Sequence, residues 1–301
     1  MSKIAKCSLL FSFAVTLLSL TSCGNRVTNS NLLNGNPADP TFLEVNRSMQ
    51  QSSNNSQDAV FEGMDAAFDY FFTPPLAANA NTDTVIYTYE NGWHHLIINH
   101  INDTTGSSYY LDDSVQFKDT LGAVQQYPDT MNLGSVEVHV KRYLHIAQYD
   151  LYASFKFKGE DTVTAAALLV KNADDTTATF NGTAQEGAHG TFIHPDSGVE
   201  CSLDAAVNHA IYDLVLIING NNCPISGQLA ASGSVNIVCP FSTDTLTISG
   251  NWTRTVNIGP NNVTIIAHNN TTRWILVIPK SEFCNNNPVV ALDRLPGRFQ
   301  P

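Results

Sequence analysis

Hydrophobic and polar residues alternate with a period of two along most of the chain from residue 84 onward. This is the pattern of half-buried β-strands. Turn-forming residues separate the runs, and no helical pattern lies between them, so parallel β-α-β units are not expected. Strands are predicted at Thr84–Glu90, Trp93–Ile101, Tyr109–Phe117, Ser135–Ile146, Tyr152–Phe157, Thr162–Val170, Thr176–Ala184, Thr245–Ile258, Asn262–His268 and Arg273–Ile278. The chain is therefore predicted to be mainly β, as an antiparallel sandwich, half-barrel or barrel.

One dipeptide sets the register of the first two strands. Asn91-Gly92 is a strong hairpin signal, because a two-residue turn of type I′ needs positive φ at both positions. A turn there gives the facing pairs Tyr89–His94, Tyr87–Leu96 and Val85–Ile98.

Residues 211–239 alternate in the same way around two further turns. A turn at Asn219-Gly220 gives the pairs Leu216–Cys223, Leu214–Ile225 and Tyr212–Gly227. A three-residue loop at Ala230–Ser232 gives the pairs Cys223–Cys239, Ile225–Ile237 and Gly227–Val235. Both placements put the same residues on one apolar face, as a register set by burial requires. A three-stranded meander is expected here.

One helical pattern precedes the strands. Its apolar stripe consists of Val60, Phe61, Met64, Ala67, Phe68 and Phe71. Ser56 is the expected N-cap, Asp58 lies in the first turn, and Thr73-Pro74-Pro75 ends the helix. We predict an amphipathic helix over residues 56–72 that buries its phenylalanines, Phe68 among them, against the sheet. A helix that lies on a membrane is disfavoured, because the other face lacks lysine and arginine.

The first residues have the three-part layout of a secretory signal peptide. Lys3 and Lys6 precede an apolar run, Leu9–Leu20, and small residues follow it. The run of about 12 residues is too short to span a bilayer core. The alternative is an ordinary signal peptide with a chance cysteine at its end.

The last four residues of this segment, Leu20-Thr21-Ser22-Cys23, resemble the lipobox of bacterial lipoprotein precursors. The resemblance implies that residues 1–22 are removed and that Cys23 is acylated, becomes the mature N-terminus and holds the protein on a membrane. Gly24 stands where an aspartate commonly signals retention in the inner membrane, so the resemblance favours the outer membrane of a bacterial envelope. It covers residues 1–23 only.

The remaining chain divides by composition. Residues 23–55 are rich in Asn, Ser and Gln without an apolar period, and are predicted to form a disordered tether of roughly 30 Å. Residues 56–290 are the β domain with its leading helix, and residues 291–301 are a C-terminal tail. The glycine- and histidine-rich stretch Glu186–Gly198 is a candidate boundary, although no repeat requires a second domain.

Charge and cysteine content narrow the function. The formal net charge is −12, and loss of two lysines with the signal peptide makes it −14, so no nucleic-acid partner is expected. Four cysteines remain after Cys7 and Cys23 are set aside, and an even number in an exported protein predicts two disulfides with three possible pairings. They are Cys201, Cys223, Cys239 and Cys284. The hairpin register favours Cys223–Cys239, which leaves Cys201 to pair with Cys284; thiolate metal binding is the alternative, but no Cys-x-x-Cys pair is present.

Motifs for catalysis or metal binding are lacking. No strand carries histidines at i and i+2, and HExxH, GxSxG and a phosphate-binding glycine loop are absent. His94 and His95 point to opposite faces, and His189 and His194 flank a loop and need partners from elsewhere. The acidic pairs Asp112-Asp113 and Asp174-Asp175 lack EF-hand spacing and are expected to be solvated turn carboxylates. We assign no catalytic residue, metal or cofactor.

Three functions follow from these observations. The favoured one is a lipid-anchored, non-catalytic binding or scaffold module of the envelope, with the membrane, a protein or an apolar ligand as partner. The second is a carrier of lipid or another apolar ligand, because the order of helix and strands is similar in outline to periplasmic lipoprotein-carrier proteins. The third is a secreted hydrolase. A wide apolar cavity would favour the carrier, converging acids or histidines the hydrolase, and a filled core the scaffold.

Overall fold

The computed structural model describes residues 32–72, 84–129, 132–152, 155–218, 223–242 and 244–286. Residues Asn34–Pro301 form one compact unit, to which the description below refers. The predicted signal peptide, Cys23 and the predicted tail 291–301 lie outside the described residues, as do the side chains of Phe68 and Phe71.

In the described part of the chain, fourteen strands form one sheet. They are β1 (Leu33–Asn34), β2 (Thr84–Glu90), β3 (Trp93–Asn102), β4 (Ser107–Asp119), β5 (Val124–Gln125), β6 (Leu133–Tyr152), β7 (Phe155–Lys171), β8 (Thr177–Ile193), β9 (Glu200–Ile217), β10 (Ser226–Pro240), β11 (Thr245–Ile248), β12 (Asn251–Ile258), β13 (Asn262–His268) and β14 (Thr272–Pro279). From β14 the order is β14-β13-β12-β10-β9-β8-β7-β6-β4-β3-β2; β11 also pairs with β10, and β5 with β4. Neighbouring strands from β2 to β14 run antiparallel, as in β6–β7 and β8–β9.

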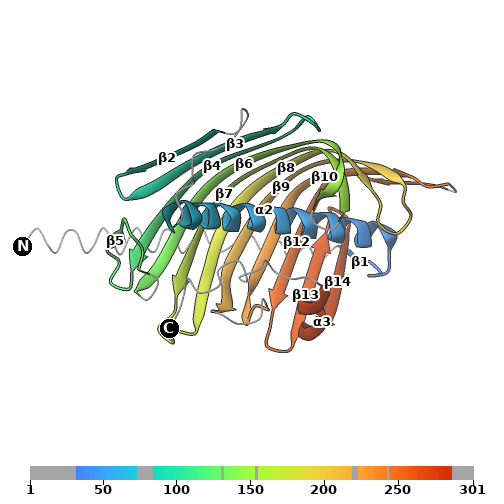
Figure 1. The fold of residues 1–301 in the computed structure, drawn as a ribbon. Coiled ribbons are helices and arrows are strands. Elements are labelled where there is room, and N and C mark those ends of the chain that lie inside the picture. The colour runs from blue at the N-terminus through green and yellow to red at the C-terminus, as the bar shows by residue number, and fades with distance from the viewer. Residues whose placement is uncertain are drawn as a thin grey trace, which may run out of the picture. The chain divides into compact units, whose positions relative to one another are not determined.

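The mainly β prediction is confirmed, and the sheet is open. No pairing joins β2 to β14 in the described residues. A single sheet is not a sandwich, so the half-barrel is the nearest of the three predicted arrangements. The sheet curves past one long helix, α2 (Pro40–Phe72), which crosses its strands (Figure 1). A second helix, α3 (Lys280–Asn286), follows β14.

The first hairpin is confirmed in its predicted register. Asn91 and Gly92 have φ values of 54° and 86°, as a type I′ turn requires. The facing pairs Tyr89–His94, Tyr87–Leu96 and Val85–Ile98 are all observed.

The predicted three-stranded meander over residues 211–239 is wrong, although its first two strands do pair antiparallel, as β9 and β10. The turn predicted at Asn219-Gly220 lies outside the described residues. Ala230–Ser232 is no loop but the middle of β10, which pairs with β9 on one side and β12 on the other. The predicted register is also displaced, since Tyr212 faces Gln228 rather than Gly227, and Val215 faces Ser226. Small residues at Ala230–Gly233 resemble a turn in sequence, but Ala231 is buried in a cluster with Phe42 and Met49 of α2.

The stretch Glu186–Gly198 is not a domain boundary. Its first part, up to Ile193, continues β8 inside the one compact unit. Gly190 faces Gly159 on β7, and a Cβ at Gly190 would lie 2.2 Å from the Lys158 carbonyl oxygen. The glycines that suggested a break in the sequence therefore permit a close approach of two strands.

Helix α2 begins 16 residues before the predicted start, so residues 40–55 are not a disordered tether. Asp39 is the N-cap, since its Oδ1 accepts a hydrogen bond from the Thr41 amide at 2.8 Å, and Pro40 occupies the first helical position. Ser56, the predicted cap, lies mid-helix. The helix is described as far as Phe72, the predicted last residue, and the predicted stop at Thr73-Pro74-Pro75 lies outside the described residues. A 33-residue helix is about 50 Å long, which matches the width of about ten strands.

Both ends of the described part of α2 pack by apolar contacts. Phe42, Val45 and Met49 contribute to one hydrophobic cluster, and Val60, Phe61 and Met64 to another, the latter three as predicted. Among the residues that the structure describes, no helix is long and apolar enough to cross a membrane.

Candidate functional site: a polar network and cavity beneath α2

The middle of α2 is polar and yet buried. Its buried polar residues are Gln51, Ser52, Ser53, Asn55, Ser56 and Gln57. A buried polar group without a hydrogen-bond partner costs on the order of 1–3 kcal/mol, so the inner face of the sheet has to supply partners for this segment.

Glu186 of β8 is the main partner. Its Oε2 accepts hydrogen bonds from Ser52 Oγ at 2.8 Å and Ser56 Oγ at 3.0 Å, and its Oε1 accepts one from Asn55 Nδ2 at 3.3 Å. The residue is 5% exposed. Burial raises the pKa of Glu186 to about 7, although the hydrogen bonds from α2 and the charge of Arg142 oppose this shift. Glu186 can therefore change its charge near neutral pH.

His209 of β9 lies beside this carboxyl group. Its Nε2 is 2.8 Å from Ser52 Oγ, and its Nδ1 is 3.3 Å from Ser53 Oγ. Burial, and secondarily the charge of Arg254, lowers the pKa of His209 to about 4, so the ring is neutral at neutral pH.

Ser52, His209 and Glu186 do not form a catalytic triad. In a triad the serine and the acid contact opposite nitrogens of the imidazole. Here Glu186 Oε2 lies 3.6 Å from Nε2, the nitrogen that contacts Ser52. The geometry therefore gives no activated serine nucleophile.

Arg142 of β6 joins the helix to a second buried acid. Its Nη2 donates to Asp161 Oδ2 of β7 at 3.1 Å and to the Asn55 carbonyl oxygen at 3.2 Å, and its Nη1 donates to Glu62 Oε2 at 3.3 Å. Asp161 is 1% exposed. The guanidinium thus balances a carboxylate that burial alone would destabilise.

A cavity of about 270 Å³ lies between α2 and strands β7 to β10. Its apolar lining is formed by Phe157, Ala188, Phe192, Pro195, Leu203, Ala205, Val207 and Val235. Its polar lining is formed by Glu44, Arg47, Ser48, Gln51, Ser52, Asn55, Asp161 and Glu186. Ala188 and Ala205 face each other across β8 and β9, and their short side chains leave space under the helix.

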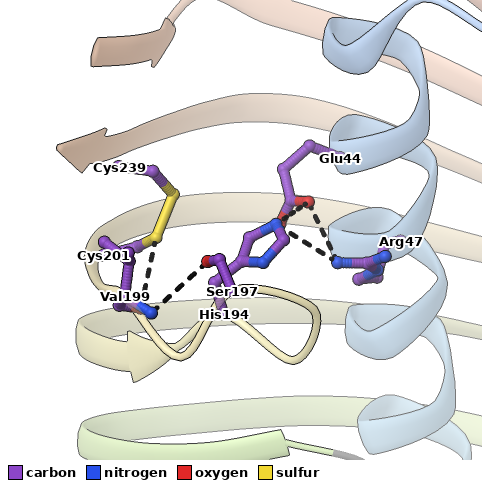
Figure 2. Close-up of a disulfide and its surroundings, with 7 residues drawn as sticks. All are labelled: Glu44, Arg47, His194, Ser197, Val199, Cys201 and Cys239. Atoms are coloured by element: carbon purple, nitrogen blue, oxygen red, sulfur yellow. Dashed lines mark hydrogen bonds and ion pairs between the residues drawn. A yellow bond between two sulfur atoms is a disulfide. The ribbon is translucent and has the colours of Figure 1, made fainter. Parts of the chain in front are cut away.

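A cluster of charged residues lies at the cavity beside the loop between β8 and β9. Arg47 Nη2 donates to Asp196 Oδ2 at 2.8 Å, and its Nη1 donates to Glu44 Oε2 at 3.2 Å. His194 Nε2 lies 3.3 Å from the same Glu44 oxygen (Figure 2). Asp196 is exposed, Arg47 is partly exposed and Glu44 is buried, so this cluster marks the side of the cavity toward solvent.

The prediction of two disulfides is confirmed for the described residues, but the predicted pairing is wrong. Cys201 bonds to Cys239, and Cys223 bonds to Cys284. Because β10 is one continuous strand, its C-terminal end faces the start of β9, where Ser202 pairs with Val238. The first disulfide therefore closes the β9–β10 ladder next to the loop in Figure 2.

The histidines and acidic pairs considered in the sequence are spread over the sheet. On the outer face, away from α2, His145 lies 3.8 Å from Glu160 and His189 lies 3.7 Å from Asp204. Among the described residues, no group of three His, Cys, Asp or Glu side chains is placed to hold a metal ion.

The acidic pairs likewise do not converge. Asp113 faces α2 and is fully buried, contrary to the expected solvated carboxylate, while its neighbour Asp112 lies on the opposite face and is partly exposed. Asp174 accepts hydrogen bonds from Thr177 in a turn, and Asp175 pairs with Lys171.

The sequence interpretation missed Glu186, Asp161, Arg142 and His209. A usable signal was present. Glu186 has the same parity as the buried Ala184 and Ala188 on β8, so it stands at an inward position among apolar residues. His209 likewise follows Val207 at the inward parity of β9. A charged residue at a core-facing position of a strand indicates a buried polar partner.

No family model, curated protein or solved structure matches this chain. The function is accordingly inferred from the geometry of the site.

Proposed function

We propose that the protein is a lipid-anchored envelope protein that binds a small, largely apolar ligand in the cavity beneath α2. The cavity is the observation that carries the proposal. At about 270 Å³ it exceeds the roughly 150 Å³ of an engineered cavity that binds benzene, and it lies near the lower end of natural ligand pockets. On the same scale it accommodates about ten non-hydrogen atoms.

The lining separates apolar from polar groups, as is expected of a ligand site. Phenylalanine, leucine, valine and alanine side chains of β7 to β10 form the apolar wall, and α2 supplies hydroxyl, amide and charged groups. Apolar area contributes affinity, while a few polar groups orient the ligand. A filled core would have favoured the scaffold function instead.

The membrane anchor is the second part of the proposal. It is supported by the signal peptide and by the resemblance of Leu20–Cys23 to a lipobox. A lipid on Cys23 would hold the cavity-bearing unit at the membrane, where apolar ligands are concentrated.

Ligand binding can be tested with 1-octanol and the full-length chain carrying Cys23→Ser, which cannot be acylated at that position. Octanol should raise the melting temperature, because a ligand that binds only the folded state stabilises it. Ala205→Leu, which fills the cavity, should abolish this shift. Ala206→Leu on the exposed outer face of β9 is the matched control and should retain it. An unchanged octanol shift in Ala205→Leu would refute binding in the cavity.

A secreted hydrolase is the second candidate, because two buried carboxyl groups line one cavity in different surroundings. Asp161 is paired with Arg142, while burial raises the pKa of Glu186 to about 7. Acids with contrasting environments serve as base and acid in several hydrolases. Turnover in a substrate screen that Glu186→Gln abolishes and Glu160→Gln retains would favour this candidate over binding alone.

A further inference from the structure

Charged groups are unevenly distributed around the cavity. Three carboxyl groups line it, from Glu44, Asp161 and Glu186, and one guanidinium, from Arg47. Arg47 is already shared between Glu44 and Asp196. The wall opposite α2 is apolar apart from Asp161, which is paired with Arg142, and Glu186, so the carboxyl group of Glu186 lies among hydrocarbon side chains.

We propose that the cavity selects ligands with a cationic head, that is, small apolar amines, whose ammonium group binds beside Glu186. This proposal rests on the proposed function and specifies its ligand class. An ammonium ion has three donors and no acceptor, which suits carboxylate and amide oxygens. Glu186 Oε1 accepts one hydrogen bond, from Asn55, and a carboxylate oxygen has capacity for a second.

The hydrogen bonds around Glu186 suit both of its protonation states. When Glu186 is ionised, Ser52 donates to it, and His209 Nε2–H donates to Ser52 Oγ. When Glu186 is protonated, it donates to Ser52 Oγ, Ser52 donates to His209 Nε2, and His209 Nδ1–H donates to Ser53 Oγ. The observed distances of 2.8, 2.8 and 3.3 Å permit either arrangement. A ligand can therefore change the charge of Glu186 without leaving a neighbouring hydroxyl unpaired.

The charged groups around Glu186 determine how the affinity for an ammonium ligand changes with pH. The titratable and charged groups around Glu186 are Glu44 and Arg47 of α2, Arg142 of β6, Asp161 of β7, and His209 of β9, which has Arg254 of β12 near it. An ammonium ligand favours ionised Glu186. Its affinity should thus be full above pH 7 and fall about tenfold for each pH unit below it, or about 100-fold by pH 5.

The test compares three probes of equal chain length with the full-length Cys23→Ser chain: n-octylamine, 1-octanol and octanoate. Calorimetric titration at pH 8 should show octylamine binding about 10- to 100-fold tighter than octanol, as a charge-assisted hydrogen bond implies, and octanoate binding most weakly. At pH 6, octylamine binding should release about one proton, measurable in buffers of different ionisation enthalpy. Octanol binding should show no such proton release.

Glu186→Gln should abolish both the preference for octylamine over octanol and the pH dependence of octylamine binding. Octanol should still bind to this variant. Glu160→Gln, on the outer face of β7, is the control and should leave the preference and the pH dependence unchanged. Octanol binding by the variant also reports that it is folded; should it fail to fold, proton release by the unsubstituted Glu186 chain still decides the question.

The outcomes separate the two proposals. Octanol binding with no preference for octylamine, or a preference for octanoate, would overturn the amine proposal and leave the ligand-binding function standing. Failure of all three probes to bind would overturn both.

Discussion

Asp113 provides a quantitative test of how α2 packs on the sheet. Its side chain lies under Gly63 of the helix, where a Cβ would be 2.7 Å from Asp113 Oδ1. The residue has no exposed surface. Burial, with a smaller contribution from the charge of Asp112, raises the pKa of Asp113 from 3.8 to about 8. The folded protein therefore holds a proton there that the unfolded chain releases above about pH 4.

The difference between the pKa of Asp113 in the folded and unfolded states determines how stability changes with pH. Between the two pKa values the folded state binds more protons than the unfolded state, so stability falls as pH rises. Each pH unit in that window changes the free energy of unfolding by roughly 1.4 kcal/mol. Asp113→Asn keeps the shape and removes the titration. As the pH rises from 5 to 7, the free energy of unfolding of the variant should increase by about 3 kcal/mol relative to that of the parent chain.

Urea unfolding of the full-length Cys23→Ser chain at pH 5, 6 and 7, with and without Asp113→Asn, measures this change. Asp112→Asn is the matched control, because Asp112 lies on the opposite face of β4 and is partly exposed. Between pH 5 and pH 7 its free energy of unfolding should change relative to the parent chain by less than about 0.5 kcal/mol, as is usual for surface substitutions. Equal pH profiles for Asp113→Asn and its parent would refute the buried, protonated state of Asp113.

Four further predictions test other parts of the molecule. Cys23→Ser should abolish lipid labelling and membrane partitioning in a bacterial host; retained labelling would exclude Cys23 as the acylation site. Non-reducing peptide mapping should join Cys201 to Cys239, and replacing both by alanine should cost about 4 kcal/mol for a loop of this length. Asp39→Ala should cost about 1 kcal/mol in urea unfolding through loss of the N-cap, and no loss would place the helix start elsewhere. Phe61→Ala should cost about 3–5 kcal/mol, because the 2% exposed ring packs on the sheet; a cost below about 1 kcal/mol would contradict that packing.

The sequence alone determined the features that depend on neighbouring residues. Alternation of apolar and polar side chains located most strands, since it directly reflects the two faces of a sheet. Asn91-Gly92 determined the register of its hairpin through backbone conformations that both residues tolerate. The even number of cysteines after Cys23, together with the predicted export, indicated two disulfides.

Features that depend on distant contacts could not be read in this way. Strands β6 to β9 are 17 to 20 residues long, which is longer than the segments predicted from the alternation of apolar and polar residues. The small residues at Ala230–Gly233 and at Gly190 looked like turns. In the structure they permit close approach of a helix or a neighbouring strand. The pairing of Cys239 depends on β10 being one continuous strand.

The N-terminal half of α2 shows most clearly the difference between what local sequence determines and what distant contacts decide. Residues 40–55 have too few apolar side chains to indicate burial, so their composition predicts disorder. They fold as a buried helix because Glu186, His209 and Arg142, which are more than 80 residues away, provide hydrogen-bond partners for Ser52 and Asn55. The sequence contains both halves of this network, but only the tertiary structure shows that they meet and that an open cavity remains beside them.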